Sequence, residues 1–347
     1  MPTKVGFMFF LLTAALVAAC EPLVSQPMAG PDAVVGPLVW PQPPNRPRIR
    51  FVKFVARPTD LGIQPSFWQR AWDLIAGAEE QWLIRPTGVA ANEQSIYVAD
   101  PGAQALWIFD LQAGRFRRIP ATDNQFLVSP VAISLGLKNR IYVADSYLAK
   151  VFIYDTEGKP IGTIADPNLK RPAGIAYDAS RDRLYVADSA AHRIWIFAGD
   201  GRPLGAIGRQ GTGNGEFNRP TYIAVDRAGT LYVTDSLGFR LQMFNADGSF
   251  MGLFGRHGDT SGDFAMPKGV AVDSEGHIYV VDALFDAVQI FDRHGQYLLT
   301  FGERGIRPGQ FWLPGGLFID GHNRIYVADT YNQRIQIFEY LGGGGNE

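Results

Sequence analysis

Six aspartates in this chain end one recurring tetrapeptide, Tyr-Val-x-Asp. Such carboxylates could bind a cation or act as general bases, or they could accept N–H groups from the loop that follows each strand. Because every copy carries the aspartate, we interpret it as structural. A basic residue five positions later would form a latch in four copies: Asp145 with Lys150, Asp188 with Arg193, Asp235 with Arg240, and Asp329 with Arg334.

Two copies lack that basic residue, because the fifth residue after Asp100 is Ala105 and the fifth after Asp282 is Ala287. A carboxylate without a latch is freer to bind a ligand. Asp286 stands close to Asp282, so these two form the one acidic pair that we single out for binding. The alternative is an exposed loop with solvated carboxylates.

Aromatic and basic residues accompany the aspartates and define a candidate binding face. The loops after the tetrapeptides carry Tyr147, His192, Phe239, Phe285 and Tyr331. Basic residues beside the prolines that precede each repeat are Arg85, Arg171, Arg219 and Lys268. Aromatic side chains with nearby cations are typical of a surface that binds protein or glycan. The alternative is that these aromatics only cover the end of the domain.

The elements that would position these residues follow from the repeat itself. Successive tetrapeptides are 45, 43, 47, 47 and 47 residues apart, a period typical of a solenoid or propeller. Each copy follows a proline by 11 to 13 residues and is followed by two more apolar runs, which predicts four antiparallel strands. The units begin near Pro86, Pro130, Pro172, Pro220, Pro267 and Pro314.

The sixth unit is one strand short, because the chain ends in a glycine-rich tail (342–347) after three strands. Residues 48–55 read as a strand and resemble the other fourth strands, so we predict that this segment completes the last unit and closes the ring. The sequence therefore predicts an all-β, six-bladed propeller over 48–341. Phe217, Phe264 and Phe311, at a spacing of 47, are predicted to plug the junctions between blades.

The combined pattern Pro-x-Gly-Val-Ala-Val-Asp, Gly-x-Ile-Tyr-Val-x-Asp, Arg-Ile-Gln-Ile-Phe and Phe-Gly-x-x-Gly resembles the NHL repeat family. The resemblance extends from Pro86 to about Tyr340 and implies a six-bladed propeller. Relatives bind RNA, bind proteins or act as metal-dependent lyases. A lyase would need histidines that converge on the channel, and only His192 and His257 are placed near the binding face. A lactonase-like carboxylate site stays open as an alternative.

The first residues predict export. Lys4 precedes an apolar run that is too short to span a bilayer, and Val17-Ala18-Ala19-Cys20 resembles the lipobox of bacterial lipoproteins. We predict a signal over 1–19, lipidation of Cys20, and a proline-rich tether over 20–47. Ordinary secretion is the alternative. Glu21, at the position after the cysteine, favours sorting to the outer membrane. The net charge of −2 provides no positive electrostatic field that would attract nucleic acid.

Residues 66–76 depart from the repeat and predict a short amphipathic helix with Trp68 and Trp72 on its apolar side. The helix could pack on the propeller, dock a partner, or rest on lipid.

Taken together, the sequence predicts a lipid-anchored platform that faces the periplasm or the cell surface and binds an envelope protein without a cofactor. The alternatives are a glycan or small-molecule receptor that uses the channel, and a metal-dependent lyase or lactonase-like enzyme.

Overall fold

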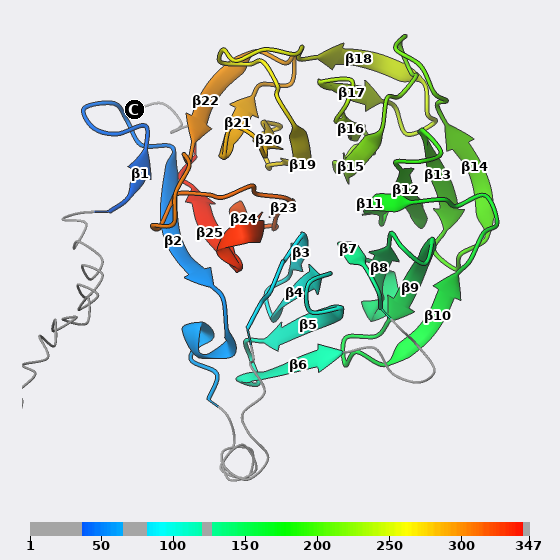
Figure 1. Cartoon of the computed structure of the whole chain (residues 1–347), viewed down its shortest axis with the longest axis horizontal. Helices are drawn as coiled ribbons and strands as arrows, with labels where there is room; N and C mark the ends of the chain where they lie inside the picture. Colours follow the sequence, from blue (N-terminus) through cyan, green and yellow to red (C-terminus); the bar gives the residue numbers. More distant parts are fainter. Residues whose placement is uncertain (1–36, 65–81, 120–126, 343–347) are drawn as a thin grey trace, which may run out of the picture. The chain divides into compact units, whose positions relative to one another are not determined.

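The computed structural model describes residues 37–64, 82–119 and 127–342. The predicted signal, Cys20, and the predicted helix with Trp68 and Trp72 lie outside these residues. The described chain forms six antiparallel sheets arranged as the blades of a propeller around a centre (Figure 1).

Blades one to five each contain four consecutive strands, with the first strand innermost and the fourth at the rim (Figure 1). Blade one has β3 (Gly88–Ala91), β4 (Ser95–Asp100), β5 (Ala105–Asp110) and β6 (Arg115–Ile119). Blade two has β7 (Pro130–Leu135), β8 (Ile141–Asp145), β9 (Lys150–Tyr154) and β10 (Pro160–Ile164). Blade three has β11 (Pro172–Asp178), β12 (Arg183–Asp188), β13 (Arg193–Ala198) and β14 (Pro203–Ile207). Blade four has β15 (Pro220–Val225), β16 (Leu231–Asp235), β17 (Arg240–Phe244) and β18 (Phe250–Phe254). Blade five has β19 (Pro267–Val272), β20 (Ile278–Asp282), β21 (Ala287–Phe291) and β22 (Tyr297–Phe301).

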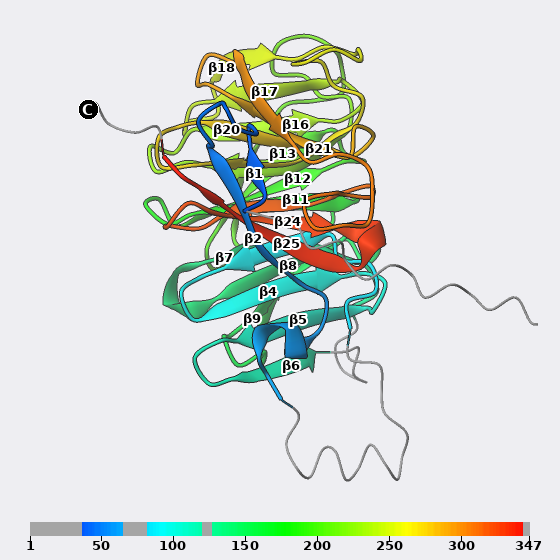
Figure 2. The ribbon, with the colours of Figure 1, turned by 90° about the vertical axis from the view of Figure 1, so that its left-hand side faces the viewer.

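Blade six joins the two ends of the described chain. Its strands are β23 (Leu317–Ile319), β24 (Arg324–Asp329), β25 (Arg334–Tyr340), β2 (Ile49–Val55) and β1 (Val39–Trp40). β2 pairs with β25 in antiparallel register, from Ile49 opposite Tyr340 to Val55 opposite Ile335. Figure 2 shows β2 beside β25. The predicted closing strand is therefore confirmed. Short 3₁₀ turns occupy Pro58–Leu61, Leu137–Asn139 and Thr330–Asn332.

The predicted tether is wrong at its carboxyl end, because the residues just before β2 already belong to the propeller. β1 pairs with β2, and Trp40 packs its ring 5.9 Å from Phe301 and 5.8 Å from Phe338. Burial of part of the apolar Trp40 side chain stabilises this attachment. The prediction of a tether over 20–47 rested on its many prolines, which gave no sign of this packing.

In four of the six repeats the proline and the aspartate lie opposite each other. In blades two to five the proline that begins the first strand pairs with the tetrapeptide aspartate, and a β-bulge follows it. We call this residue the leading proline. Proline suits the start of a strand because it has no N–H to donate. The bulge re-aims the residues that come next, which are those that face the centre.

Phenylalanine rings fill the junctions between blades, as predicted. Phe217, Phe264 and Phe311 are fully buried. Each ring lies against a glycine at the start of its connector, so close that a Cβ on the glycine would overlap the ring. The glycines are Gly208, Gly255 and Gly302, with φ between 83° and 93°. Ring and glycine therefore form a matched pair at each of these three junctions.

Candidate functional site

The tetrapeptide aspartates serve as hydrogen-bond acceptors for the backbone. Asp282 accepts N–H groups from Ala265 (2.7 Å) and Met266 (3.0 Å) in the connector that precedes the blade. It also accepts N–H groups from Leu284 (3.1 Å) and Phe285 (3.3 Å) in the following loop. The sequence indicated only the loop. Burial raises the pKa of Asp282, against the opposing effect of these N–H groups.

Two of the four predicted latches form. Arg240 lies 3.1 Å from Asp235, and Arg334 lies 2.8 Å from Asp329. Both arginines are buried, and Arg334 donates its remaining N–H groups to the carbonyls of the preceding connector. Burial raises the pKa of both aspartates, and the paired arginines act in the opposite direction.

The other two latches are wrong. Within the described residues, no ion pair joins Asp145 to Lys150 or Asp188 to Arg193. Asp145 instead accepts four backbone N–H groups, and Asp188 accepts four together with the indole N–H of Trp195 at 3.3 Å. A carboxylate that already has these donors does not need the basic side chain.

The predicted acidic pair does not form an open site. Asp286 is buried and accepts the N–H of Leu313 at 2.6 Å, which ties blade five to the next connector. Burial raises the pKa of Asp286. Asp282 and Asp286 thus have separate backbone donors, and both carboxylates hold connectors.

A glutamine clamp holds the same connectors in blades four to six, and the sequence reasoning missed it. Gln336 accepts the N–H of Gly309 at 2.9 Å and donates to the carbonyl of Gln310. Gln242 and Gln289 make the same pair of bonds. The signal was available, because the three glutamines are spaced by 47 residues in the Arg-Ile-Gln-Ile-Phe pattern.

The loops after the tetrapeptides gather on one face of the ring and expose apolar side chains. At the second position after the aspartate, the exposed fractions are 76% for Tyr147, 43% for Leu237, 54% for Leu284 and 49% for Tyr331. Trp312, 41% exposed, packs against Tyr331 with ring centres 5.8 Å apart. Sequence reasoning missed Leu237 and Leu284 because it looked for aromatic residues, and it missed Trp312 because this residue lies on a connector and not in a loop after a tetrapeptide.

Three residues predicted for this face are only half exposed. Phe239 packs against His257 with ring centres 4.4 Å apart and the rings tilted by 60°, and Phe285 is half-buried. His192 accepts the backbone N–H of Arg219 at its Nδ1 (3.2 Å), so this histidine fixes a connector.

Of the basic residues predicted for the face, Arg85, Arg171 and Arg219 lie on the connectors that lead into the first strands, and Lys268 is the second residue of β19. Arg85 lies over the ring of Tyr331 at 5.9 Å. Burial lowers the pKa of Lys268, and the positive charges of Arg219 and Arg171 lower it further. These three cations therefore influence one another.

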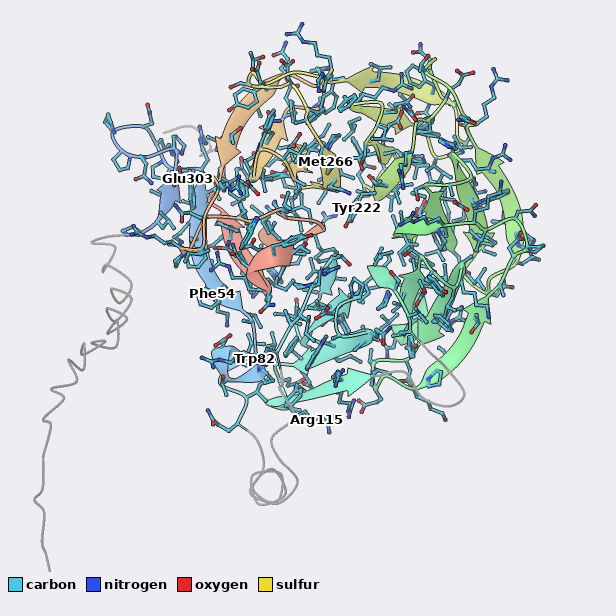
Figure 3. All side chains as sticks on the ribbon, viewed as in Figure 1. Phe54, Trp82, Arg115, Tyr222, Met266 and Glu303 are labelled. Atoms are coloured by element: carbon cyan, nitrogen blue, oxygen red, sulfur yellow. The ribbon has the colours of Figure 1, made fainter. Side chains whose placement is uncertain are left out.

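The first strands of all six blades surround a central cavity of about 270 Å³. Its lining is mainly aliphatic, with Val, Ile, Ala and Leu side chains. Three aromatic residues, Tyr177, Tyr222 and Phe318, also line it. Tyr222 lies beside the opening at the centre of the ring (Figure 3). Its hydroxyl donates to the carbonyl of Thr87 at 3.1 Å, from blade four to the opposite blade one. Tyr222 thus crosses the channel.

Over the ranges 37–64, 82–119 and 127–342, no three His, Cys, Asp or Glu side chains converge to hold a metal ion. Among the residues that the structure describes, no helix has the length and hydropathy needed to cross a membrane.

Comparisons with known proteins agree with the architecture. Residues 169–255 match a family described as a 6-bladed β-propeller, and residues 264–286 and 311–338 match the NHL repeat. No curated protein matches the chain. The fold defines the protein as a six-bladed β-propeller. Its fifth and sixth blades carry NHL repeats, which confirms the resemblance for those segments.

Several solved structures share the fold at low sequence identity. A protein of unknown function from Bacteroides thetaiotaomicron is 16% identical with a TM-score of 0.60, over 75% of this chain and 70% of that one. Streptogramin B lyase is 13% identical with a TM-score of 0.57, over 74% and 94% of the chains. An auxiliary nutrient binding protein from Bacteroides thetaiotaomicron is 12% identical with a TM-score of 0.59, over 76% and 71%. At these identities the likeness shows the fold alone.

Proposed function

We propose that this protein is an exported, lipid-anchored propeller that binds another protein of the cell envelope through the face that carries the aspartate loops. The supporting observation is the set of exposed apolar residues at one equivalent position in four blades: Tyr147, Leu237, Leu284 and Tyr331. We call this set the apolar ring. Contiguous exposed apolar side chains on a soluble domain are typical of interaction surfaces, and aromatic residues are enriched at the energetic centres of interfaces.

The scaffold suits a binding role, because the loops of the face are held by buried hydrogen bonds. Every tetrapeptide aspartate accepts an N–H group from the preceding connector, and four of them also accept N–H groups from their own loop: Asp100, Asp145, Asp188 and Asp282. The glutamine clamp fixes the connectors of three blades. A rigid loop loses little conformational entropy when a partner binds, so more of the contact energy remains as affinity.

A receptor that uses the channel has less support. The cavity of about 270 Å³ is small for an organic ligand, and Tyr222 crosses it. Its lining is mainly aliphatic, whereas a sugar needs several polar partners for its hydroxyls.

Capture of a partner from envelope extract tests the proposal. The triple variant Tyr147→Ser, Leu284→Ser, Tyr331→Ser should lose most of a stoichiometric protein that the wild type retains. The matched control, Ile161→Ser with Met251→Ser, changes residues that are 50% and 52% exposed on the outermost strands β10 and β18, and it should retain that protein. Equal capture by the triple variant, or retention of glycan in place of any protein, would refute the proposal.

A further inference from the structure

Three basic residues stand at the mouth of the central cavity on neighbouring blades. Arg171 and Arg219 come directly before the leading prolines of β11 and β15, and Lys268 comes directly after that of β19. The first strands of these blades pack side by side around the centre. The cavity lining begins two to four residues further along the same strands. We call Arg171, Arg219 and Lys268 the cation triad.

The triad has no neutralising carboxylate within the described part of the chain. No Asp or Glu oxygen described lies within 4.0 Å of these three side chains. The nearest tetrapeptide aspartates are already engaged: Asp188 and Asp282 accept backbone N–H groups, and Asp235 pairs with Arg240. Lys268 is half-buried, whereas Arg171 and Arg219 are exposed. Neighbouring like charges repel one another, so a ligand that neutralises them would be stabilised there.

The electrostatics of Lys268 show that the three charges interact. The pKa of Lys268 is lowered first by burial and then by the charges of Arg219 and Arg171, both of which are positive. An isolated surface lysine would have neither effect. The position thus combines one half-buried lysine with two exposed arginines and an excess of positive charge.

Tyr222 lines the cavity three residues after Arg219. Burial raises the pKa of its phenol, and its hydroxyl donates to the carbonyl of Thr87. The uncharged ring of Tyr222 therefore adds no negative charge that would oppose an anion at the triad.

We propose that the cation triad binds one oxyanion, a carboxylate or phosphate group, at the channel mouth. This deepens the proposed function, because the group could be an anchor supplied by the protein partner that the surrounding apolar ring contacts. The same chemistry is also offered by a free small anion. Charge-assisted hydrogen bonds from guanidinium and ammonium groups to such oxygens are the strong ones in proteins.

Calorimetric titration of the purified full chain with inorganic phosphate tests the site without any partner. We expect saturable binding that weakens as NaCl is raised, because salt screens the attraction. Lys268→Gln should weaken the affinity roughly tenfold or more, as should Arg171→Gln with Arg219→Gln, since each charged hydrogen bond is worth about 1.5–3 kcal/mol.

Arg202→Gln is the matched control, because Arg202 is an exposed cation in the turn between β13 and β14, at the opposite end of the blade from the aspartate loops. Its affinity for phosphate should equal that of the wild type. Thermal melting of each variant should match the wild type, so that a loss of binding is not a loss of fold.

A second measurement follows Lys268 itself. After reductive methylation with ¹³C-labelled methyl groups, each lysine gives an NMR signal. The signal that is absent from Lys268→Gln belongs to Lys268 and reports its protonation. Saturating phosphate should raise its pKa, because a bound anion favours the charged form. A site that merely shapes the connector would not produce that shift.

Peptides distinguish the sources of the anion. A short peptide with a free carboxyl terminus should bind, and its amidated form should not, if a partner supplies the group; phosphate binding with neither peptide binding indicates a free small anion. Absence of phosphate binding, or equal binding by the wild type and Lys268→Gln, overturns the cation triad. Loss of partner capture in the apolar-ring variant is independent of either result.

Discussion

At the scale of the residue, the role of the tetrapeptide aspartate follows from the backbone N–H groups whose hydrogen bonds it accepts. Asp282 is fully buried and accepts N–H groups from both the connector before its blade and the loop after it. Unpaired buried N–H groups would cost free energy, so one carboxylate satisfies two segments that would otherwise lack acceptors. Repetition around the ring follows from this structural role.

The latch in blade six should be the most costly single contact to break. We expect Asp329→Ala to lower the free energy of unfolding by about 3–5 kcal/mol, because it leaves Arg334 buried without its carboxylate. Urea denaturation measures the change.

Glu339→Ala is the control for that prediction. Glu339 pairs with Arg50 at the surface, where both side chains are substantially exposed, so its removal should cost less than about 1 kcal/mol. A similar loss for the two variants would mean that burial does not set the strength of the latch.

At the scale of the element, the connectors between blades depend on the fit between a glycine and a ring. Gly255 and Gly276 have similar backbone angles, with φ of 93° and 86°. A Cβ at Gly255 would overlap the ring of Phe264, whereas a Cβ at Gly276 would meet nothing within 4 Å.

Alanine substitutions at these two glycines should therefore separate the cost of backbone strain at positive φ from the cost of overlap between the new Cβ and the Phe264 ring. Gly276→Ala should cost about 1–2 kcal/mol, the cost of a left-handed conformation for a side chain with a Cβ. Gly255→Ala should cost about 1–3 kcal/mol more, because the junction must repack. Thermal or urea denaturation of the two variants gives the comparison, and equal losses would contradict the plug.

The closing strand β2 offers a second test at this scale. Ile49 is fully buried between blades five and six, whereas Val52 of the same strand is 45% exposed. Ile49→Ala should destabilise the protein by about 2–5 kcal/mol, and Val52→Ala should change its stability by no more than about 0.5 kcal/mol. A closing strand that contributes little would give small effects for both variants.

At the scale of the whole molecule, the ring brings together residues that are far apart in sequence. Blade six pairs β2 with β25, and the Tyr222 hydroxyl joins blade four to blade one across 135 residues of chain. A closed ring leaves no free end at which blades can separate, which suits a platform whose face must stay fixed.

The proposed location of the propeller can be tested at the predicted lipid site. Cys20→Ser should move the protein from the membrane fraction to the soluble fraction, because serine lacks the sulfur to which the acyl anchor would be attached. Fractionation followed by immunoblotting measures this. Retention of the variant in the membrane would count against lipidation.

The periodic sequence was sufficient to predict the blades and their closure. Short-range patterns determine them: the proline, the Tyr-Val-x-Asp strand and the apolar runs recur, and residues 48–55 match the missing strand. Two latches, Asp235 with Arg240 and Asp329 with Arg334, also form as predicted. All four predicted pairs lie opposite each other on adjacent strands, so the register along the hairpin does not by itself decide which of them form.

The tertiary structure alone decided which side chains meet between blades. Asp145 and Asp188 find enough donors in their connectors to do without a latch, and Asp286 turns to the N–H of Leu313. The cation triad and the Tyr222 crossing arise only once the ring closes. Sequence spacing reports neighbours along a strand or hairpin, whereas these contacts depend on the distances between blades, which are set by the packing of the whole ring.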